Sequence, residues 1–264
     1  MRQKHGQNFL IDNNIVNNII KAAELNNNDN VLEIGPGKGI LTKVITPLVN
    51  KLTAVEIDKI LFDQLKHYFN FHNATNIELI NEDFLKYNLT DGNPFKVISN
   101  LPYNVGTAIL QQILPTPNWT IAVVMLQKEV IERLAAKPGG KEYGFISIFT
   151  QFYADANILF NVSPSCFNPK PEVMSAVIKL TNKNPQTPNE NFFPLIKHSF
   201  SMRRKTMLNC LSSFIPMSAR NNQSNESITK PEAENILRKA GVDPILRPDK
   251  LSIDNFLTIS NLLP

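Results

Sequence analysis

The fold of this chain is decided by the stretch Asn-Val-Leu-Glu-Ile-Gly-Pro-Gly-Lys-Gly at residues 30–39. Its first five residues are mostly apolar and predict a buried strand. Three glycines at alternating positions follow, and residues 40–45 then have helical spacing. A strand, a glycine-rich turn and a helix make the first half of a β-α-β unit, in which a nucleotide-like ligand can approach the backbone closely. We therefore expect an α/β fold with a ligand site at the carboxyl end of this strand.

The remaining elements extend this unit into a sheet. Strands alternate with helices up to residue 180, as in an open, mostly parallel sheet. Further strands are predicted at residues 52–58, 77–83, 96–99, 120–126, 156–162 and 175–180, and helices at residues 13–23, 107–114, 129–136 and 144–153. The predicted fold class is a doubly wound, mostly parallel, Rossmann-like α/β sheet.

The carboxyl-terminal part has a different composition. Residues 181–190 are polar and contain two prolines, which favours a linker. Beyond it, helices are predicted over residues 192–214, from a capping box at Thr229 to near Gly241, and after an N-cap at Ser252. We therefore divide the chain into a domain of residues 1–184 and a small all-helical domain of residues 185–264.

Two acidic residues at predicted strand ends belong with the glycine turn. The turn lacks the third glycine of a dinucleotide fingerprint, because Ile40 stands there; its spacing resembles the S-adenosylmethionine loop of class I methyltransferases. Glu56 follows Gly37 by about 20 residues, the spacing at which a carboxylate binds a ribose diol. Asp83 ends the next strand and could accept from an adenine amino group. Either acid alone is more often a solvated strand end.

The tetrapeptide Asn100-Leu101-Pro102-Tyr103 follows the predicted strand at residues 96–99. It suits methylation of an amino group on a base. The Asn100 side-chain oxygen and the Leu101 carbonyl can accept the two N–H hydrogens of adenine, and Pro102 stiffens the turn. Tyr103 offers a face on which a splayed-out base can stack. The alternative interpretation is an ordinary β-turn that contains proline.

Taken in chain order, the motifs resemble those of the small-subunit ribosomal RNA adenine dimethyltransferases, the KsgA family. The resemblance rests on residues 4–10, 33–37, 100–104, 126–130, 167–173, 200–206 and 251–256. It covers nearly the whole chain. The dimethyltransferases that act on large-subunit RNA and confer antibiotic resistance share the first half only.

This resemblance implies an S-adenosylmethionine-dependent enzyme that methylates two adjacent adenosines, each twice, near the 3′ end of small-subunit (16S) RNA. It implies that Asn8 and Leu10 close over the cofactor and that Phe167 stacks on the target adenine opposite Tyr103. Phe167 otherwise reads as an aromatic residue that packs a loop. The expected cofactor site comprises Asn8, Leu10, Gly35, Gly37, Glu56, Asp83 and Asn100, and the expected catalytic set comprises Asn100, Leu101, Pro102, Tyr103 and Phe167.

A basic triplet, Arg203-Arg204-Lys205, lies in the second predicted domain. On a helix three successive residues fan out, so they cannot all face the core. Contacts from these residues to phosphates would position RNA without reading its sequence. Lys128 and Lys170 are further candidates for RNA binding. The alternative is a solvated helix face.

Composition sets broader limits. The net charge is +4 and the pI about 9.0, which tolerates an anionic partner. Two distant cysteines, Cys166 and Cys210, argue against a disulfide framework or zinc site. The sequence contains neither a leader-like apolar segment nor a run of membrane-spanning length. We expect a cytoplasmic monomer that uses no metal and binds an immature small ribosomal subunit through its RNA.

Three rival functions stay open at this stage. One is a large-subunit RNA dimethyltransferase, which only the substrate would distinguish. Another is a DNA adenine methyltransferase, although such enzymes commonly have proline at the position of Leu101. The third is an assembly factor for small subunits in which methylation is secondary. The intact Gly37, Asn100 and Tyr103 argue against loss of activity.

Overall fold

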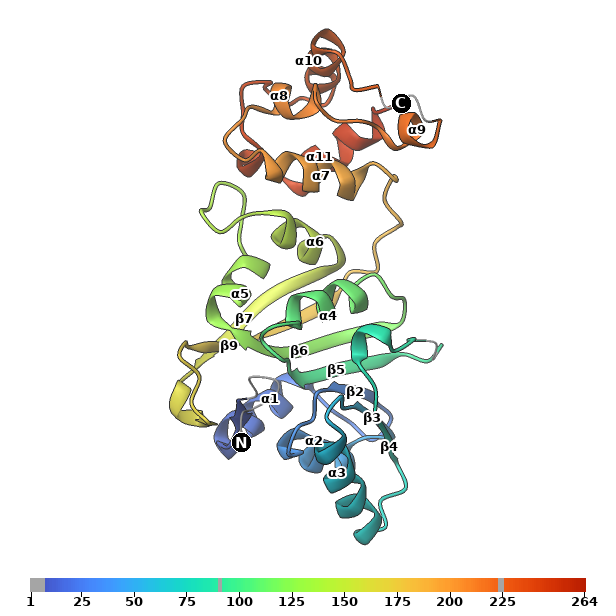
Figure 1. The fold of residues 1–264 in the computed structure, drawn as a ribbon, viewed down its shortest axis with the longest axis vertical. Coiled ribbons are helices and arrows are strands. Elements are labelled where there is room, and N and C mark those ends of the chain that lie inside the picture. Colours follow the sequence, from blue (N-terminus) through green and yellow to red (C-terminus); the bar gives the residue numbers. More distant parts are fainter. Residues whose placement is uncertain (1–7, 90–91, 223–225) are drawn as a thin grey trace. The chain divides into compact units, whose positions relative to one another are not determined.

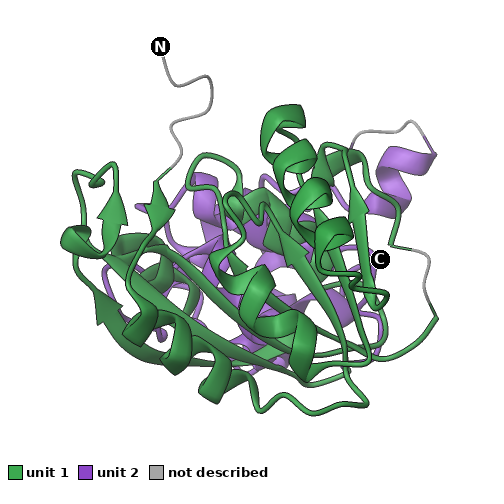
Figure 2. Ribbon diagram, turned by 90° about the horizontal axis from the view of Figure 1, so that it is seen from below, with its two compact units in different colours: residues 1–135, 153–184 green, residues 136–152, 185–264 purple. Residues whose placement is uncertain are grey.

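The computed structural model describes residues 8–89, 92–222 and 226–264. The chain forms two compact units, which Figure 2 shows in different colours: residues 1–135 with 153–184, and residues 136–152 with 185–264. The second unit therefore consists of two segments of the chain. Its longer segment begins after residue 184, which is where we placed the domain boundary. Residues 4–7, which begin the amino-terminal motif, lie outside the described residues.

The second unit differs from the expected carboxyl-terminal domain because it also contains residues 136–152. Within this unit, the Tyr143 hydroxyl donates a hydrogen bond to the Leu251 carbonyl over 3.0 Å. The rings of Phe152 and Phe192 lie with their centroids 5.0 Å apart. Such contacts join segments that are far apart in the sequence, so a composition change at a linker could not reveal them.

The first unit is built on a seven-stranded sheet with the strand order β4-β3-β2-β5-β6-β9-β7 (Figure 1). Its strands are β2 (Asn30–Ile34), β3 (Lys51–Val55), β4 (Ile77–Ile80), β5 (Phe95–Asn100), β6 (Trp119–Gln127), β7 (Ala154–Val162) and β9 (Ser175–Asn182). The strands β2 to β6 are parallel, and β9 is antiparallel to both of its neighbours. The strand order reverses between β2 and β5, and in open α/β sheets ligands bind at such a switch point, beyond the carboxyl ends of the strands.

Helices cover both faces of this sheet. Figure 1 shows α1, α2 and α3 on one side and α4 and α5 on the other. These helices are α1 (Asn13–Ala23), α2 (Ile40–Ile45), α3 (Lys59–Phe71), α4 (Gly106–Ile113) and α5 (Lys128–Leu134), with short 3₁₀ turns η1 (Thr46–Leu48), η2 (Phe84–Lys86) and η3 (Pro164–Cys166). A separate two-stranded sheet pairs β1 (Phe9–Leu10) with β8 (Phe167–Asn168). The predicted doubly wound, mostly parallel sheet is therefore confirmed.

Helix α3 is an element that the sequence analysis does not predict. The Asp58 side chain caps it by accepting the Ile60 backbone N–H over 2.8 Å. Leu61, Leu65 and Phe69 are buried at helical spacing, so one face of α3 packs on the unit. Its other residues are largely polar or aromatic, which weakens the apolar periodicity that identifies a helix.

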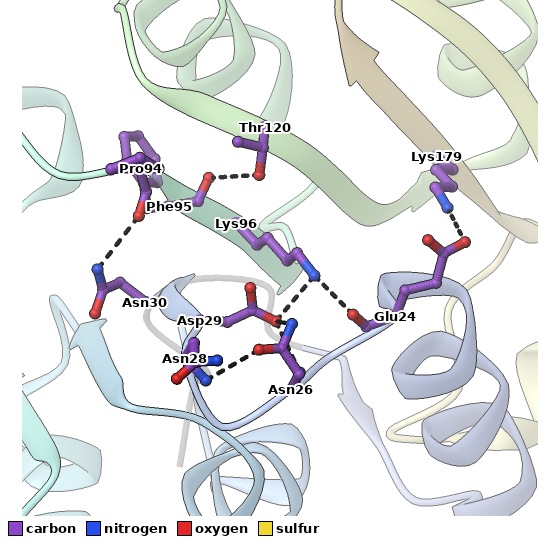
Figure 3. A network of polar contacts seen from close by, with 10 residues as sticks. All are labelled: Glu24, Asn26, Asn28, Asp29, Asn30, Pro94, Phe95, Lys96, Thr120 and Lys179. Atoms are coloured by element: carbon purple, nitrogen blue, oxygen red, sulfur yellow. Dashed lines mark hydrogen bonds and ion pairs between the residues drawn. The ribbon is translucent and has the colours of Figure 1, made fainter.

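A polar network ties the loop after α1 to the start of β5 and to β9 (Figure 3). Lys96 on β5 donates to Asp29 over 2.9 Å and to the Glu24 carbonyl over 2.7 Å. Lys179 on β9 pairs with the Glu24 carboxylate over 2.7 Å. The Lys96–Asp29 pair is largely buried, with side-chain exposures of 11% and 16%. Because a buried charge without its partner is costly, this network fixes the loop at the end of the sheet opposite the switch point.

The second unit is helical. It contains α6 (Phe145–Tyr153, of which Tyr153 belongs to the first unit), α7 (Phe192–Ser201), α8 (Met207–Leu211), α9 (Met217–Asn221), α10 (Lys230–Lys239), the 3₁₀ turn η4 (Pro248–Lys250) and α11 (Ile253–Asn261). Capping boxes at Thr229 and Ser252 confirm the predicted starts of α10 and α11.

One helix prediction in this unit is wrong. Residues 192–214 do not form a single helix: α7 ends at Ser201, and α8 begins after a turn at residues 202–206. Thr206 is the N-cap of α8, and its hydroxyl accepts the Asn209 backbone N–H over 3.4 Å. A new cap inside an apolar pattern ends one helix and starts another.

Among the described residues, no helix has the length and apolar character needed to cross a membrane. The same residues contain no cluster of three or more His, Cys, Asp or Glu side chains that could hold a metal ion. Cys166 and Cys210 are free thiols.

Candidate active site

The glycine-rich turn after β2 has a backbone that other residues adopt only with strain. Gly37 has a φ of 60°, in the left-handed region. A Cβ atom at Gly37 would lie 3.1 Å from the Phe9 ring of β1. The Gly35 N–H donates to the Val55 carbonyl over 2.9 Å, which fixes the turn against the end of β3. The turn therefore presents its backbone at the switch point.

Glu56, the residue after β3, holds the same turn through its carboxylate. One oxygen accepts the Gly37 N–H and the other accepts the Asp58 N–H, each over 2.9 Å. Glu56 is only 2% exposed. Burial raises the pKa of this carboxyl, and the two backbone donors oppose that shift. Each oxygen has lone-pair capacity left for a hydroxyl donor, so Glu56 can serve a ribose diol while it shapes the turn.

Glu33, inside β2, is a second buried carboxyl at this site that we did not predict as a site residue. It is 1% exposed, and its Oε2 atom finds no hydrogen-bond partner within the described part of the chain. Burial raises the pKa of Glu33 to about 8, and the neighbouring charge of Glu56 adds to the shift. The available signal was a carboxylate in the middle of an apolar strand, which is rare without a partner.

Asp83 ends the segment after β4 and caps the turn η2, where its Oδ1 atom accepts the Leu85 N–H over 3.0 Å. Beside it, two apolar residues are unusually open to solvent. Ile57 is 50% exposed and Leu85 is 41% exposed. Both line the same pocket as Asp83. An exposed apolar pair next to a carboxylate suits the binding of a flat base that has an amino group. The sequence analysis did not predict Ile57 or Leu85 as site residues.

Asn100, the last residue of β5, presents a buried acceptor to the pocket. Its Nδ2 atom donates to the Asn8 carbonyl over 3.3 Å, which orients the amide. Its Oδ1 atom is buried and has no hydrogen-bond partner among residues 8–89, 92–222 and 226–264. The Leu101 N–H donates to the Met125 carbonyl over 3.1 Å, and the Pro102 carbonyl accepts the Gly106 N–H over 2.8 Å at the start of α4. The turn is thus held rigidly on both sides.

Tyr103 lies at the pocket with its hydroxyl 2.5 Å from Ser175 Oγ of β9. Burial raises the pKa of Tyr103, and the hydrogen bond to Ser175 opposes that shift. The phenol therefore stays neutral, and its ring is anchored at the hydroxyl end.

The structure brings together nearly all of the predicted cofactor and catalytic residues. A single pocket is lined by Asn8, Leu10, Gly35, Gly37, Glu56, Asp83, Asn100, Leu101, Pro102 and Tyr103. Phe167 is the exception: it is 1% exposed and packs in the hydrophobic core with Leu10 and Val16 rather than lining this pocket. Its role against the target base stays a prediction that requires the ring to become accessible.

The predicted RNA-binding residues fall on both units. Lys128 and Lys170 belong to the first unit, where Lys128 lies 3.7 Å from the Glu132 carboxylate. The triplet Arg203-Arg204-Lys205 is exposed in the second unit, but in the turn between α7 and α8 rather than on a helix. Arg203 donates to the Lys141 carbonyl over 2.5 Å, so this side chain also stabilises its own unit.

The strand order, the glycine-rich turn and the acidic residues after β3 and β4 define a class I methyltransferase. The comparisons agree and go further. A family profile described as "Ribosomal RNA adenine dimethylase" matches residues 1–244. The chain belongs to this family and is therefore a ribosomal RNA methyltransferase. The family and the fold imply S-adenosylmethionine as the methyl donor.

Sequence relatives match over nearly the full length. The protein named "Ribosomal RNA small subunit methyltransferase A" from Anoxybacillus flavithermus is 41% identical, covering 98% of this chain and 88% of the relative. The protein of the same name from Lachnoclostridium phytofermentans is 38% identical, covering 99% of this chain and 91% of the relative.

Solved structures share the fold. A dimethyladenosine transferase from Plasmodium falciparum superposes with a TM-score of 0.81 at 25% identity, covering 95% of each chain. The 23S rRNA methyltransferase ErmE superposes with a TM-score of 0.71, also at 25% identity, covering 97% of this chain and 99% of that one.

Proposed function

We propose that this enzyme transfers methyl groups from S-adenosylmethionine to the 6-amino groups of two adjacent adenosines near the 3′ end of small-subunit ribosomal RNA, giving dimethyladenosines. Its substrate is the RNA within an immature small subunit, and it acts as a cytoplasmic monomer. The observation that carries the proposal is the buried Oδ1 atom of Asn100, which has no hydrogen-bond partner in the described part of the chain and lies in one pocket with Gly37 and Glu56.

The pocket fits the proposed methyl donor. One buried oxygen of the pocket, Glu33 Oε2, lacks a partner in the described chain, and a ligand with N–H donors and positive charge would satisfy it. Glu56 would hold the ribose, and Asp83 with the open side chains of Ile57 and Leu85 would hold the adenine. When bound, S-adenosylmethionine supplies a methyl group that its sulfonium has already activated.

The protein's own contribution to the chemistry is alignment of the target amine. The exocyclic nitrogen of adenine is a poor nucleophile because its lone pair is delocalised into the ring. Asn100 Oδ1 and the Leu101 carbonyl would accept its two hydrogens and turn the lone pair toward the methyl group. Tyr103 would support the base by stacking. The proton leaves to solvent after methylation has made the nitrogen acidic, so a strong general base is unnecessary.

The choice of small-subunit RNA is supported by the relatives at 38–41% identity, whose printed name specifies the small subunit. The large-subunit enzyme ErmE matches at only 25% identity. Leu101 is also unlike the proline that DNA adenine methyltransferases commonly have there. A large-subunit or DNA substrate is therefore less favoured.

The test is labelled methyl transfer from S-adenosylmethionine to unmodified small subunits, large subunits and duplex DNA in parallel. We expect label only in small subunits, in two adjacent nucleotides near the 3′ end. Label in large subunits or DNA instead would refute the substrate.

The matched control for this test is Asn100→Ala. Loss of one preorganised hydrogen-bonding group should lower turnover by about 10²–10³-fold. Its affinity for the cofactor, measured by calorimetry, should stay near that of the wild type. Full turnover in this variant would remove Asn100 from the proposed mechanism.

A further inference from the structure

A second pocket lies on the first unit, between the glycine-rich turn, α2 and α3. Its volume is about 460 Å³, within the range of roughly 300–1,000 Å³ that is typical of ligand sites. It is lined chiefly by Lys38, Lys43, His67, Tyr68, Phe71 and His72. Gly37 and Lys38 line both this pocket and the active-site pocket, so the two sites share the same turn.

The aromatic side chains of this pocket form a cluster in which Phe71 and His72 are exposed and Tyr68 is half-buried. The rings of Tyr68 and His72 are stacked, with centroids 4.2 Å apart and an interplanar angle of 30°. The Phe71 ring meets His72 edge to face at 5.2 Å. Phe71 is 76% exposed, although it ends a helix whose other face is buried. An exposed ring beside a stacked pair offers a face on which a base can stack.

The charges of the pocket are of one sign. Lys43 Nζ lies 4.4 Å from the Tyr68 ring centroid, and Lys38 Nζ lies 4.6 Å from that of Phe9. Among the described residues that line this pocket, none is Asp or Glu. Two lysines and an aromatic surface match an anionic ligand that also has a flat ring.

We propose that this pocket binds an unpaired nucleotide of the ribosomal RNA substrate, with its base on the Phe71–Tyr68–His72 surface and its phosphate near Lys43 and Lys38. Aromatic stacking combined with basic side chains is how proteins hold single-stranded nucleic acid without reading its sequence. This inference rests on the proposed function, because it requires an RNA substrate. It adds a second contact for that substrate on the outer side of the cofactor turn.

The experiment measures binding of a short fluorescein-labelled oligouridylate by anisotropy. The variants are Phe71→Ala, its conservative partner Phe71→Tyr, and Lys43→Glu. Lys21→Glu on α1 is the matched charge-reversal control, since Lys21 is exposed and lies outside the pocket. Calorimetric affinity for S-adenosylmethionine shows that each variant is folded.

We expect Phe71→Ala to weaken oligouridylate binding by about 5- to 150-fold, which corresponds to a base-stacking contribution of about 1–3 kcal/mol. Phe71→Tyr should bind like the wild type. Lys43→Glu should weaken binding and lower the salt slope by about 1, while Lys21→Glu should leave both nearly unchanged.

Wild-type binding by both Phe71→Ala and Lys43→Glu would overturn the inference. So would variants that bind oligouridylate normally but small subunits weakly, because the surface would then contact a ribosomal protein. A different result would separate the two proposals. If the wild type does not methylate small subunits but Phe71→Ala still weakens oligouridylate binding, the proposed substrate is rejected and the nucleotide site is retained.

Discussion

The Tyr103 hydroxyl lies 2.5 Å from Ser175 Oγ, and this contact joins the turn after β5 to the first residue of β9. Ser175 is completely buried, whereas Tyr103 lines the active-site pocket. The hydrogen bond therefore anchors the hydroxyl end of the Tyr103 ring to strand β9. Ser175 is a positioning residue for a ring that we expect to stack on the target base.

This relationship predicts that Tyr103→Phe and Ser175→Ala each lower turnover on small subunits by about 2- to 12-fold, because the net contribution of one hydrogen bond is about 0.5–1.5 kcal/mol. The double variant should be about as active as either single variant, since both remove the same contact. Tyr103→Ala should be much less active, because the stacking surface itself is lost. Additive losses in the double variant would show that the hydroxyl and Ser175 act separately.

A second prediction concerns Glu56. Glu56→Ala should weaken S-adenosylmethionine binding by about 1.5–3 kcal/mol or more, because it removes charge-assisted hydrogen bonds to the ribose and frees the Gly37 N–H. Calorimetry measures this change. Glu78→Ala is the control, since Glu78 is a half-exposed acid on β4 that pairs with Lys51 at the surface. Equal affinity in both variants would contradict the ribose assignment.

A third prediction follows from Glu33, whose pKa is raised from 4.5 to about 8 by burial. Between these two values the unfolded chain ionises this group while the folded chain keeps its proton. The unfolded state then binds fewer protons, so the free energy of unfolding falls as pH rises from about 4.5 to about 8 and levels off above that. The wild type without cofactor should therefore lose stability over this window.

Glu33→Gln removes the titration but keeps the shape of the side chain. Its free energy of unfolding should exceed that of the wild type at pH 8, and the difference should shrink toward pH 5. Urea unfolding at several pH values measures this. A constant difference between the two proteins across the window would show that Glu33 is ionised in the folded protein at all these pH values.

Much of the fold follows from local sequence patterns. The predicted helix at residues 13–23 and strand at residues 30–34 coincide with α1 and β2, because each combines strong periodicity or an apolar run with clear end signals. Helix α3 was missed because its exposed face carries aromatic rings. The split between α7 and α8 was missed because the apolar spacing continues across the Thr206 cap.

The site residues that could be predicted are those whose place in the fold follows directly from their position at the end of a strand. Carboxyl ends of parallel strands meet at one edge of a sheet, so Gly37, Glu56, Asp83 and Asn100 converge on one pocket as expected. The anchoring of Tyr103 by Ser175 depends on strand β9 being inserted antiparallel beside β6, which no local pattern encodes. The burial of Phe167 likewise depends on the pairing of β8 with β1.

The last prediction concerns the basic turn of the second unit. Arg203 holds the Lys141 carbonyl, so its replacement would disturb the unit itself. Arg204 and Lys205 are exposed in the same turn, and Arg204→Glu with Lys205→Glu tests RNA binding more cleanly. The double variant should bind immature small subunits more weakly, with a salt slope lower by about 2, because fewer counterions are released per complex. Affinity for S-adenosylmethionine should stay unchanged.

The control for this double variant reverses the charge of two exposed lysines of α10, Lys230→Glu with Lys239→Glu. If both double variants weaken binding equally, the effect belongs to net charge; if neither does, the turn is a solvated surface and RNA must be held by residues such as Lys128 and Lys170.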